Sequence, residues 1–151
     1  MYITFYGVRG SIPSPGPHTI KYGGNTSCVH IELDDHRDLI FDAGTGLRIL
    51  GKHLESKTTP VNIILSHSHW DHIQGYPFFS PIYQADREIT VFNSDESEHQ
   101  LLCALFDQMD GSSFPVKAEK LPSQSVCVFK DAEKALRKKQ IIIEKKPLNH
   151  P

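Results

Sequence analysis

The chain has 151 residues, of which 38% are hydrophobic and 23% are charged, and its formal net charge at pH 7 is −2. This length and composition indicate one soluble globular domain with room for a real core. The small negative charge excludes an overall basic surface for nucleic acid, although it leaves room for a local basic groove. The apolar runs are much shorter than a membrane span, and the amino terminus lacks the features of a signal peptide.

Three cysteines, at positions 28, 103 and 127, are widely spaced and odd in number. This pattern favours free thiols in a reducing compartment over a disulfide framework. We therefore expect a cytoplasmic protein that is not attached to a membrane.

At the start of the chain, residues 1–6 are predicted to form a strand, and a loop punctuated by glycine and proline follows over residues 7–17. Arg9 in this loop is a candidate substrate-binding residue because its guanidinium donors match phosphate oxygens. A solvated arginine in an ordinary connecting loop explains it equally well.

Residues 28–33 alternate between apolar and polar types, which predicts a strand with one buried face. Its apolar side chains are expected to point inward: Val29, Ile31 and Leu33. His30 and Glu32 are then expected on the solvated face. A hairpin turn leads to a return strand over residues 39–41.

The segment Asp-Ala-Gly-Thr-Gly over residues 42–46 ends that strand and opens a predicted helix over residues 47–54. The glycines permit a positive φ and a close approach of the backbone. Asp42 or Thr45 is suited to cap this helix. An apolar run over residues 61–65 is then predicted to form a buried strand.

A dense group of metal-ligand residue types follows that strand directly. The pattern is His-x-His-x-Asp-His, formed by His67, His69, Asp71 and His72. Residues two apart in an extended segment point the same way, so His67 and His69 can aim at one metal ion. If a helix begins near Asp71, then Asp71 and His72 point elsewhere and can serve a second ion.

The ligand types also indicate what kind of metal site this is. Neutral imidazole and carboxylate groups suit zinc, manganese or iron. No cysteine lies nearby, and ligands of this type leave room for water and substrate, which favours a catalytic site over a closed structural one. The alternative is a histidine-rich surface loop, but four such residues directly after a buried strand rarely occur by chance.

The segment 75–83 is dense in aromatic residues and prolines. It is either an apolar rim of the site, with aromatics available for base stacking, or core packing against the sheet. We favour the core for Phe78 and Phe79, whereas Trp70, inside the ligand motif, is a candidate wall of the pocket. Further strands are predicted over residues 88–92 and 140–144, and further helices over residues 101–109 and 131–139.

Five stretches of the chain together resemble the metallo-β-lactamase superfamily of metal-dependent hydrolases. They are residues 5–11, 23–28, 41–46, 67–72 and 148–151. The resemblance is strongest to the phosphodiesterase branch, which is related to the tRNA 3′-end processing ribonucleases and the cyclic-nucleotide phosphodiesterases. It extends over nearly the whole chain, and the His-x-His-x-Asp-His element is its most specific part.

The resemblance implies an α+β fold, the metallo-β-lactamase αββα sandwich, and a site with two divalent metal ions. Zinc is the expected metal, with manganese or iron as alternatives. The implied ligands are His67, His69 and His150 on one ion, and Asp71 and His72 on the other. The ions would share a hydroxide that attacks phosphorus in line, and Asp71 would also orient this nucleophile as a catalytic residue.

Three further residues receive roles from the same resemblance. Asp42 is expected beneath the metals, where it holds a ligating histidine by its other nitrogen. A plain helix cap is the simpler interpretation of Asp42. Arg9 and Asn25 are expected to bind the substrate, a small-molecule or nucleotide phosphodiester.

Members of the superfamily continue beyond the third ligand element with a second β/α half, which supplies a bridging aspartate and a late histidine. We therefore expect residues 1–151 to form only the first half of the domain. The half would be a fragment, a truncated gene product, or a part completed by another chain, including a homo-oligomer. Alone, it should bind metal weakly and turn over little substrate.

Two alternatives to a phosphodiesterase remain open from the sequence. The first is a thioester or lactam hydrolase on the same scaffold. The second is a non-catalytic or degenerate module of the same fold. The context around Asn25 and Trp70 favours phosphodiesters, by resemblance alone.

Overall fold

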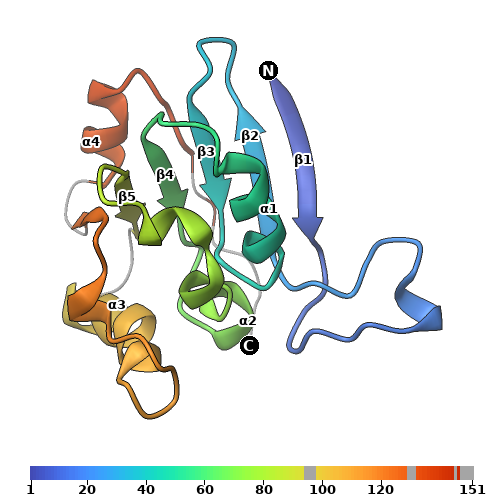
Figure 1. Cartoon of the computed structure of the whole chain (residues 1–151). Coiled ribbons are helices and arrows are strands. Elements are labelled where there is room, and N and C mark those ends of the chain that lie inside the picture. Colours follow the sequence, from blue (N-terminus) through green and yellow to red (C-terminus); the bar gives the residue numbers. More distant parts are fainter. Residues whose placement is uncertain (94–97, 129–131, 145, 147–151) are drawn as a thin grey trace.

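The computed structural model describes the chain except for residues 94–97, 129–131, 145 and 147–151 (Figure 1). In the described part, six strands form one mixed sheet whose spatial order is the order of the sequence. They are β1 (Tyr2–Gly7), β2 (Cys28–Glu32), β3 (Asp38–Phe41), β4 (Val61–Ile64), β5 (Glu88–Phe92) and β6 (Gln124–Val128). Strands β1 to β3 are antiparallel neighbours, whereas β3 to β6 run parallel.

The described helices are mostly short. The α-helices are α1 (Gly46–Leu54), α2 (Trp70–Ile73), α3 (Glu98–Phe106) and α4 (Ala132–Lys138). The 3-10 turns are Pro17–Thr19, Tyr76–Phe78, Ser80–Tyr83, Asp107–Met109 and Ala118–Lys120. Among the described residues, no helix is both long enough and apolar enough to cross a membrane.

Helix α1 covers one face of the sheet (Figure 1). Its apolar positions recur with the spacing of one helical face, at Leu47, Leu50, Gly51 and Leu54, and all four are buried. They pack against sheet residues that share this face, including Cys28, Ile40, Ile63 and Val91. This layer is the main core, and the predicted helix over residues 47–54 is confirmed with one further residue at its start.

Helix α4 packs on the opposite face, where Leu136 joins Leu39, Phe92 and Ile141 in a second cluster. The strand predicted over residues 140–144 is wrong, because residues 141–144 have no regular secondary structure. Gln140 instead adopts a left-handed conformation, with φ of 60°, and the Ile141 amide bonds the Leu136 carbonyl. The segment therefore caps α4. The sheet position beside β5 belongs to β6, which the sequence pattern did not predict.

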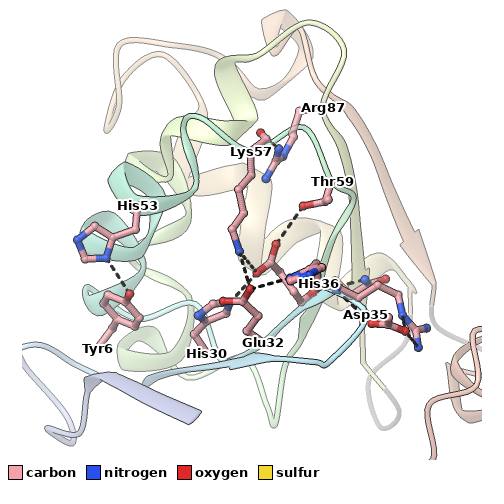
Figure 2. Close-up of polar contacts among 12 residues, drawn as sticks. Tyr6, His30, Glu32, Asp35, His36, His53, Lys57, Thr59 and Arg87 are labelled. Carbon is pink, nitrogen blue, oxygen red and sulfur yellow. Dashed lines mark hydrogen bonds and ion pairs between the residues drawn. The ribbon is translucent and has the colours of Figure 1, made fainter. Parts of the chain in front are cut away.

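Strand β2 corrects the prediction that His30 would be solvated. His30 is 7% exposed and lies on the same face as the buried Cys28, while Val29 and Ile31 are half-buried on the other face. The His30 ring, labelled in Figure 2, is accommodated because its Nε2 atom lies 2.8 Å from the fully buried Asp38 carboxylate. A buried polar group with such a partner avoids most of its desolvation cost.

The aromatic segment after α2 is only partly core. Phe79 is fully buried and confirms its prediction, whereas Phe78 is 54% exposed and does not. The two side chains differ because Phe79 packs against Gly51 of α1, while Phe78 stacks edge-on against Phe114 near the surface.

Candidate metal centre

The candidate site lies where β3 and β4 end. These two strands are parallel, with Phe41 opposite Ile64, so the segments that follow them leave the sheet at the same edge. The Asp42 amide continues the ladder by bonding the Ile64 carbonyl at 3.0 Å. Carboxyl ends of parallel strands are a common location for functional residues.

Asp42 is the most constrained side chain at this edge. It is 8% exposed, and its backbone is left-handed, with φ of 62°. Its Oδ1 atom accepts hydrogen bonds from the Ser66 amide and hydroxyl, both at 2.8 Å. Its Oδ2 atom accepts from the Ser27 hydroxyl at 2.9 Å and lies 2.8 Å from Nδ1 of His72. Burial raises the pKa of Asp42, but the hydrogen bonds from His72 and Ser66 outweigh it and hold that pKa below its usual range.

The histidines of the motif gather above this carboxylate. The ring centroid of His67 lies 4.4 Å from that of His69 and 4.1 Å from that of His72. Asp71 follows on α2, and its Oδ2 lies 3.5 Å from Nε2 of His72. Burial lowers the pKa of His72, but the Asp42 hydrogen bond and the charges of Asp42 and Asp71 raise it overall. The structure therefore brings these four sequence-predicted residues together.

The loop after β1 also reaches this site. The Ser11 amide donates a 2.8 Å hydrogen bond to Oδ2 of Asp71, and Ser11 is held in a left-handed conformation, with φ of 67°. Burial raises the pKa of Asp71, whereas the Ser11 amide and the nearby charge of His72 lower it, and the lowering effects dominate. This contact fixes one carboxylate oxygen of Asp71.

Two glycines allow α2 to dock onto the segment after β3. A Cβ atom on Gly75 would lie 1.9 Å from the Gly44 carbonyl oxygen, and one on Gly44 would lie 2.3 Å from the Asp71 carbonyl oxygen. The Ala43 amide donates to the His72 carbonyl, and the Gly75 amide donates to the Ala43 carbonyl. These two hydrogen bonds stabilise the contact. The site therefore depends on a backbone approach that larger residues would prevent.

Gly75→Ala should lower the free energy of unfolding by at least about 1–3 kcal/mol. The reason is that the added methyl group overlaps backbone atoms, which cannot rotate away as a side chain could. Urea denaturation of the two proteins would measure the change. Gly10→Ala is the matched control, since a Cβ there meets no atom within 4 Å, and it should shift stability by less than about 0.5 kcal/mol. Equal denaturation midpoints for Gly75→Ala and the wild type would refute the tight docking.

The two predicted substrate-binding residues lie in connecting segments, Arg9 after β1 and Asn25 before β2. Arg9 is exposed and pairs with Thr26 through a short parallel bridge. Asn25 is half-buried, and its side-chain Oδ1 accepts a 3.2 Å hydrogen bond from Thr45. This hydrogen bond connects the Asn25 loop to the residue that precedes α1.

The capping interpretation is not supported at α1. Thr45 is the residue before the helix, and it makes no side-chain capping bond to it. Its hydroxyl instead accepts from the Thr26 amide at 2.9 Å, while its amide donates to the Thr26 hydroxyl at 2.8 Å. The carboxylate of Asp42 is engaged by Ser27, Ser66 and His72.

The donor set at this edge fits divalent transition metals by its chemistry, because it combines imidazoles with a carboxylate. The buried Cys28 thiol nearby is unsuited to ligation, since burial and the charge of Asp42 raise its pKa to about 12 and the thiolate is the ligating form. Within the described residues, no three histidine, cysteine or acidic side chains are arranged so that they alone could hold an ion. The predicted ligand His150 lies outside the described residues.

Serines at this edge were missed by sequence reasoning. Ser27 and Ser66 both bond Asp42, and the Ser11 amide bonds Asp71. No periodicity marks such residues, and the one available signal was the position of Ser66 directly before the first histidine of the motif.

Comparison with known proteins identifies the fold. No protein-family model and no curated protein sequence matches the chain. Among solved structures, the chain is similar to the crystal structure of the metallo-beta-lactamase fold protein YhfI from Bacillus subtilis, with a TM-score of 0.53 and 19% sequence identity. The match covers 83% of this chain and 45% of that one.

The chain therefore has an α+β architecture of the metallo-β-lactamase type. At 19% identity the likeness concerns the fold alone. The chain spans less than half the length of the solved structure that it matches.

Proposed function

We propose that this chain provides the metal-binding part of a hydrolase that acts on a phosphodiester. The observation that carries the proposal is the convergence of His67, His69, Asp71 and His72 over the buried Asp42 carboxylate. A divalent ion bound there would acidify water and neutralise charge that develops on phosphate oxygens. We propose that the site binds two ions. Zinc is the proposed metal, and manganese and iron are the alternatives.

The residues of the chain take distinct roles in this proposal. His67 and His69 present imidazoles from the segment after β4, and His150 is proposed as their third partner. His72 is oriented by Asp42, whose Oδ2 lies 2.8 Å from Nδ1 and thereby leaves Nε2 as the ligating nitrogen. Asp71 has its Oδ2 held by the Ser11 amide, and we assign ligation and orientation of the nucleophile to its Oδ1.

The substrate assignment rests on the surroundings of the cluster. Trp70, directly before Asp71, is 73% exposed, which suits stacking on a base or an aryl group. Arg9 is also exposed on the loop that Ser11 ties to the site, and its charge suits a phosphate. A small-molecule or nucleotide phosphodiester is therefore the proposed substrate class.

We also propose that residues 1–151 form the first half of the catalytic domain and that further chain, or a second copy, completes it. The portion of the solved structure that matches is 45% of its length. Strand β1 supports the idea, because Tyr2, Ile3 and Phe5 are each more than half exposed, and apolar sheet faces are normally covered. The mass in solution would distinguish a monomer from a homo-oligomer.

Titration of the chain with zinc and manganese, followed by an assay with a bis-aryl phosphate, cyclic nucleotides and thioesters, tests the function. We expect metal binding and a slow, metal-dependent cleavage of the phosphodiesters above background. The double variant His67→Ala/His69→Ala should lose both metal binding and phosphodiester cleavage. His36→Ala/His53→Ala, which removes two exposed histidines from elsewhere in the fold, should retain both.

Two other results would redirect the proposal. Faster cleavage of thioesters than of phosphodiesters would favour a different hydrolase on this scaffold. Absence of metal binding would favour a non-catalytic module, the second candidate, which is consistent with the lack of a three-ligand group among the described residues.

A further inference from the structure

The hydroxyl of Ser66 lies between the buried carboxylate and two of the motif histidines. Its Oγ atom lies 2.8 Å from Oδ1 of Asp42, 3.0 Å from Nδ1 of His67 and 3.3 Å from Nδ1 of His72. Ser66 as a residue is exposed, but its amide also bonds Asp42 Oδ1, at 2.8 Å. Two hydrogen bonds to one carboxylate oxygen thus hold the residue at the end of β4.

Counting protons assigns a direction to the contacts of Ser66 with Asp42 and with His67. A carboxylate can only accept hydrogen bonds, so the single proton of the Ser66 hydroxyl goes to Asp42, which is the stronger acceptor because it is ionised. The Ser66 oxygen can then only accept from His67, which places a proton on Nδ1 of that ring. By the same rule, Nδ1 of His72 donates to Oδ2 of Asp42 at 2.8 Å.

We propose that Ser66 is a positioning residue that connects Asp42 to His67 and fixes the tautomer in which Nε2 of His67 carries the lone pair for a metal ion. This inference rests on the metal-dependent function proposed above. Asp42 then orients two ligands of the motif, His72 directly and His67 through the serine hydroxyl. One buried carboxylate sets both rings, as partners of metal-bound histidines commonly do.

The proposal predicts a specific pattern among three serine variants. Ser66→Ala removes the link to His67, and Ser66→Thr keeps the hydroxyl. Ser27→Ala removes a different hydrogen bond to Asp42, at 2.9 Å, and leaves the His67 contact in place. Circular dichroism and thermal denaturation would verify that each variant folds before it is compared.

The first measurement is the tautomer of His67, by nitrogen-15 NMR of the metal-free chain in mildly alkaline buffer. The wild type, Ser66→Thr and Ser27→Ala should show a proton on Nδ1 of His67, whereas Ser66→Ala should lose this single tautomer. The second is zinc affinity by calorimetry, which should fall about 10- to 100-fold in Ser66→Ala and be restored in Ser66→Thr.

Two results would overturn the role of Ser66. One is an unchanged His67 tautomer in folded Ser66→Ala. The other is a threonine variant that folds but behaves like the alanine variant, which would show that the hydroxyl is not the group that matters. If the wild type binds no metal, the proposed function fails, but the tautomer measurement still tests Ser66 separately.

Discussion

Replacing Asp38 with alanine is expected to lower the free energy of unfolding by about 3–5 kcal/mol, the usual cost of removing one partner from a buried ion pair. The Asp38 carboxylate is fully buried at the start of β3. Figure 2 labels three of the residues that bond it, His30, Lys57 and Thr59. The carboxylate lies 2.8 Å from Nε2 of His30 and accepts from Nζ of Lys57 at 3.0 Å and from the Thr59 hydroxyl at 3.1 Å. Without it, these donors lose their common acceptor.

Arg87 increases the free-energy cost of removing the Asp38 carboxylate. Its side chain is 2% exposed, and its guanidinium donates to the Lys57 carbonyl. Its Nε and Nη2 atoms have no hydrogen-bond partner among the described residues. Burial lowers the pKa of Arg87, and the charge of Asp38 opposes that change. Lys57 is partly exposed and can turn toward water, but Arg87 would keep an uncompensated buried charge.

Urea denaturation at neutral pH would measure the effect. Asp35→Ala is the control, because that carboxylate is exposed and pairs with Arg37 on the surface, where an ion pair contributes about 0–1 kcal/mol. A loss in Asp38→Ala no greater than that in Asp35→Ala would contradict a structural role for the buried cluster.

The same cluster predicts how stability depends on pH. Burial raises the pKa of Asp38, but hydrogen bonds from His30, Lys57 and Thr59 and the charge of Lys57 lower it, with a net decrease. A lowered folded-state pKa means that the stabilisation is fully present above the unfolded-state pKa of about 3.9 and is lost as the pH falls through the folded-state value. The stability difference between the wild type and Asp38→Asn should therefore be constant above about pH 5 and shrink in more acidic solution.

Asp42→Asn is expected to weaken zinc binding about 10- to 100-fold, the usual effect of removing a partner of a metal ligand. Asparagine has the same shape and tolerates the left-handed backbone, φ of 62°, at this position. Its amide offers one acceptor oxygen in place of two. If that oxygen keeps its bonds to Ser66, the NH2 group faces the Ser27 hydroxyl and Nδ1 of His72, which both donate to the aspartate.

Calorimetric titration with zinc would measure this loss, with circular dichroism to show that the variant folds. Asp35→Asn, a neutralisation of an exposed carboxylate outside the site, should leave the zinc affinity unchanged. If folded Asp42→Asn binds zinc as tightly as the wild type, the carboxylate does not orient the ligands, and the proposed metal centre loses its support.

Much of this protein follows from patterns that are local in the sequence. Short-range periodicity determines β1 to β5 and α1, because alternation and the 3.6-residue repeat depend on neighbours only. The spacing of His67, His69, Asp71 and His72 identifies candidate ligands for the same reason. The pattern failed at residues 140–144, where an apolar run caps α4 instead of forming a strand.

The remaining features are decided by contacts between distant segments. Parallel pairing of β3 with β4 places Asp42 beside Ser66 and His72, which lie 24 and 30 residues further along the chain. His30 becomes buried because Asp38 lies on the neighbouring strand within hydrogen-bonding distance. The sequence determines which groups are available to donate and accept hydrogen bonds. Only the packed sheet determines which of these groups meet, because a hydrogen bond requires contact. Contact between distant segments is set by the topology of the fold.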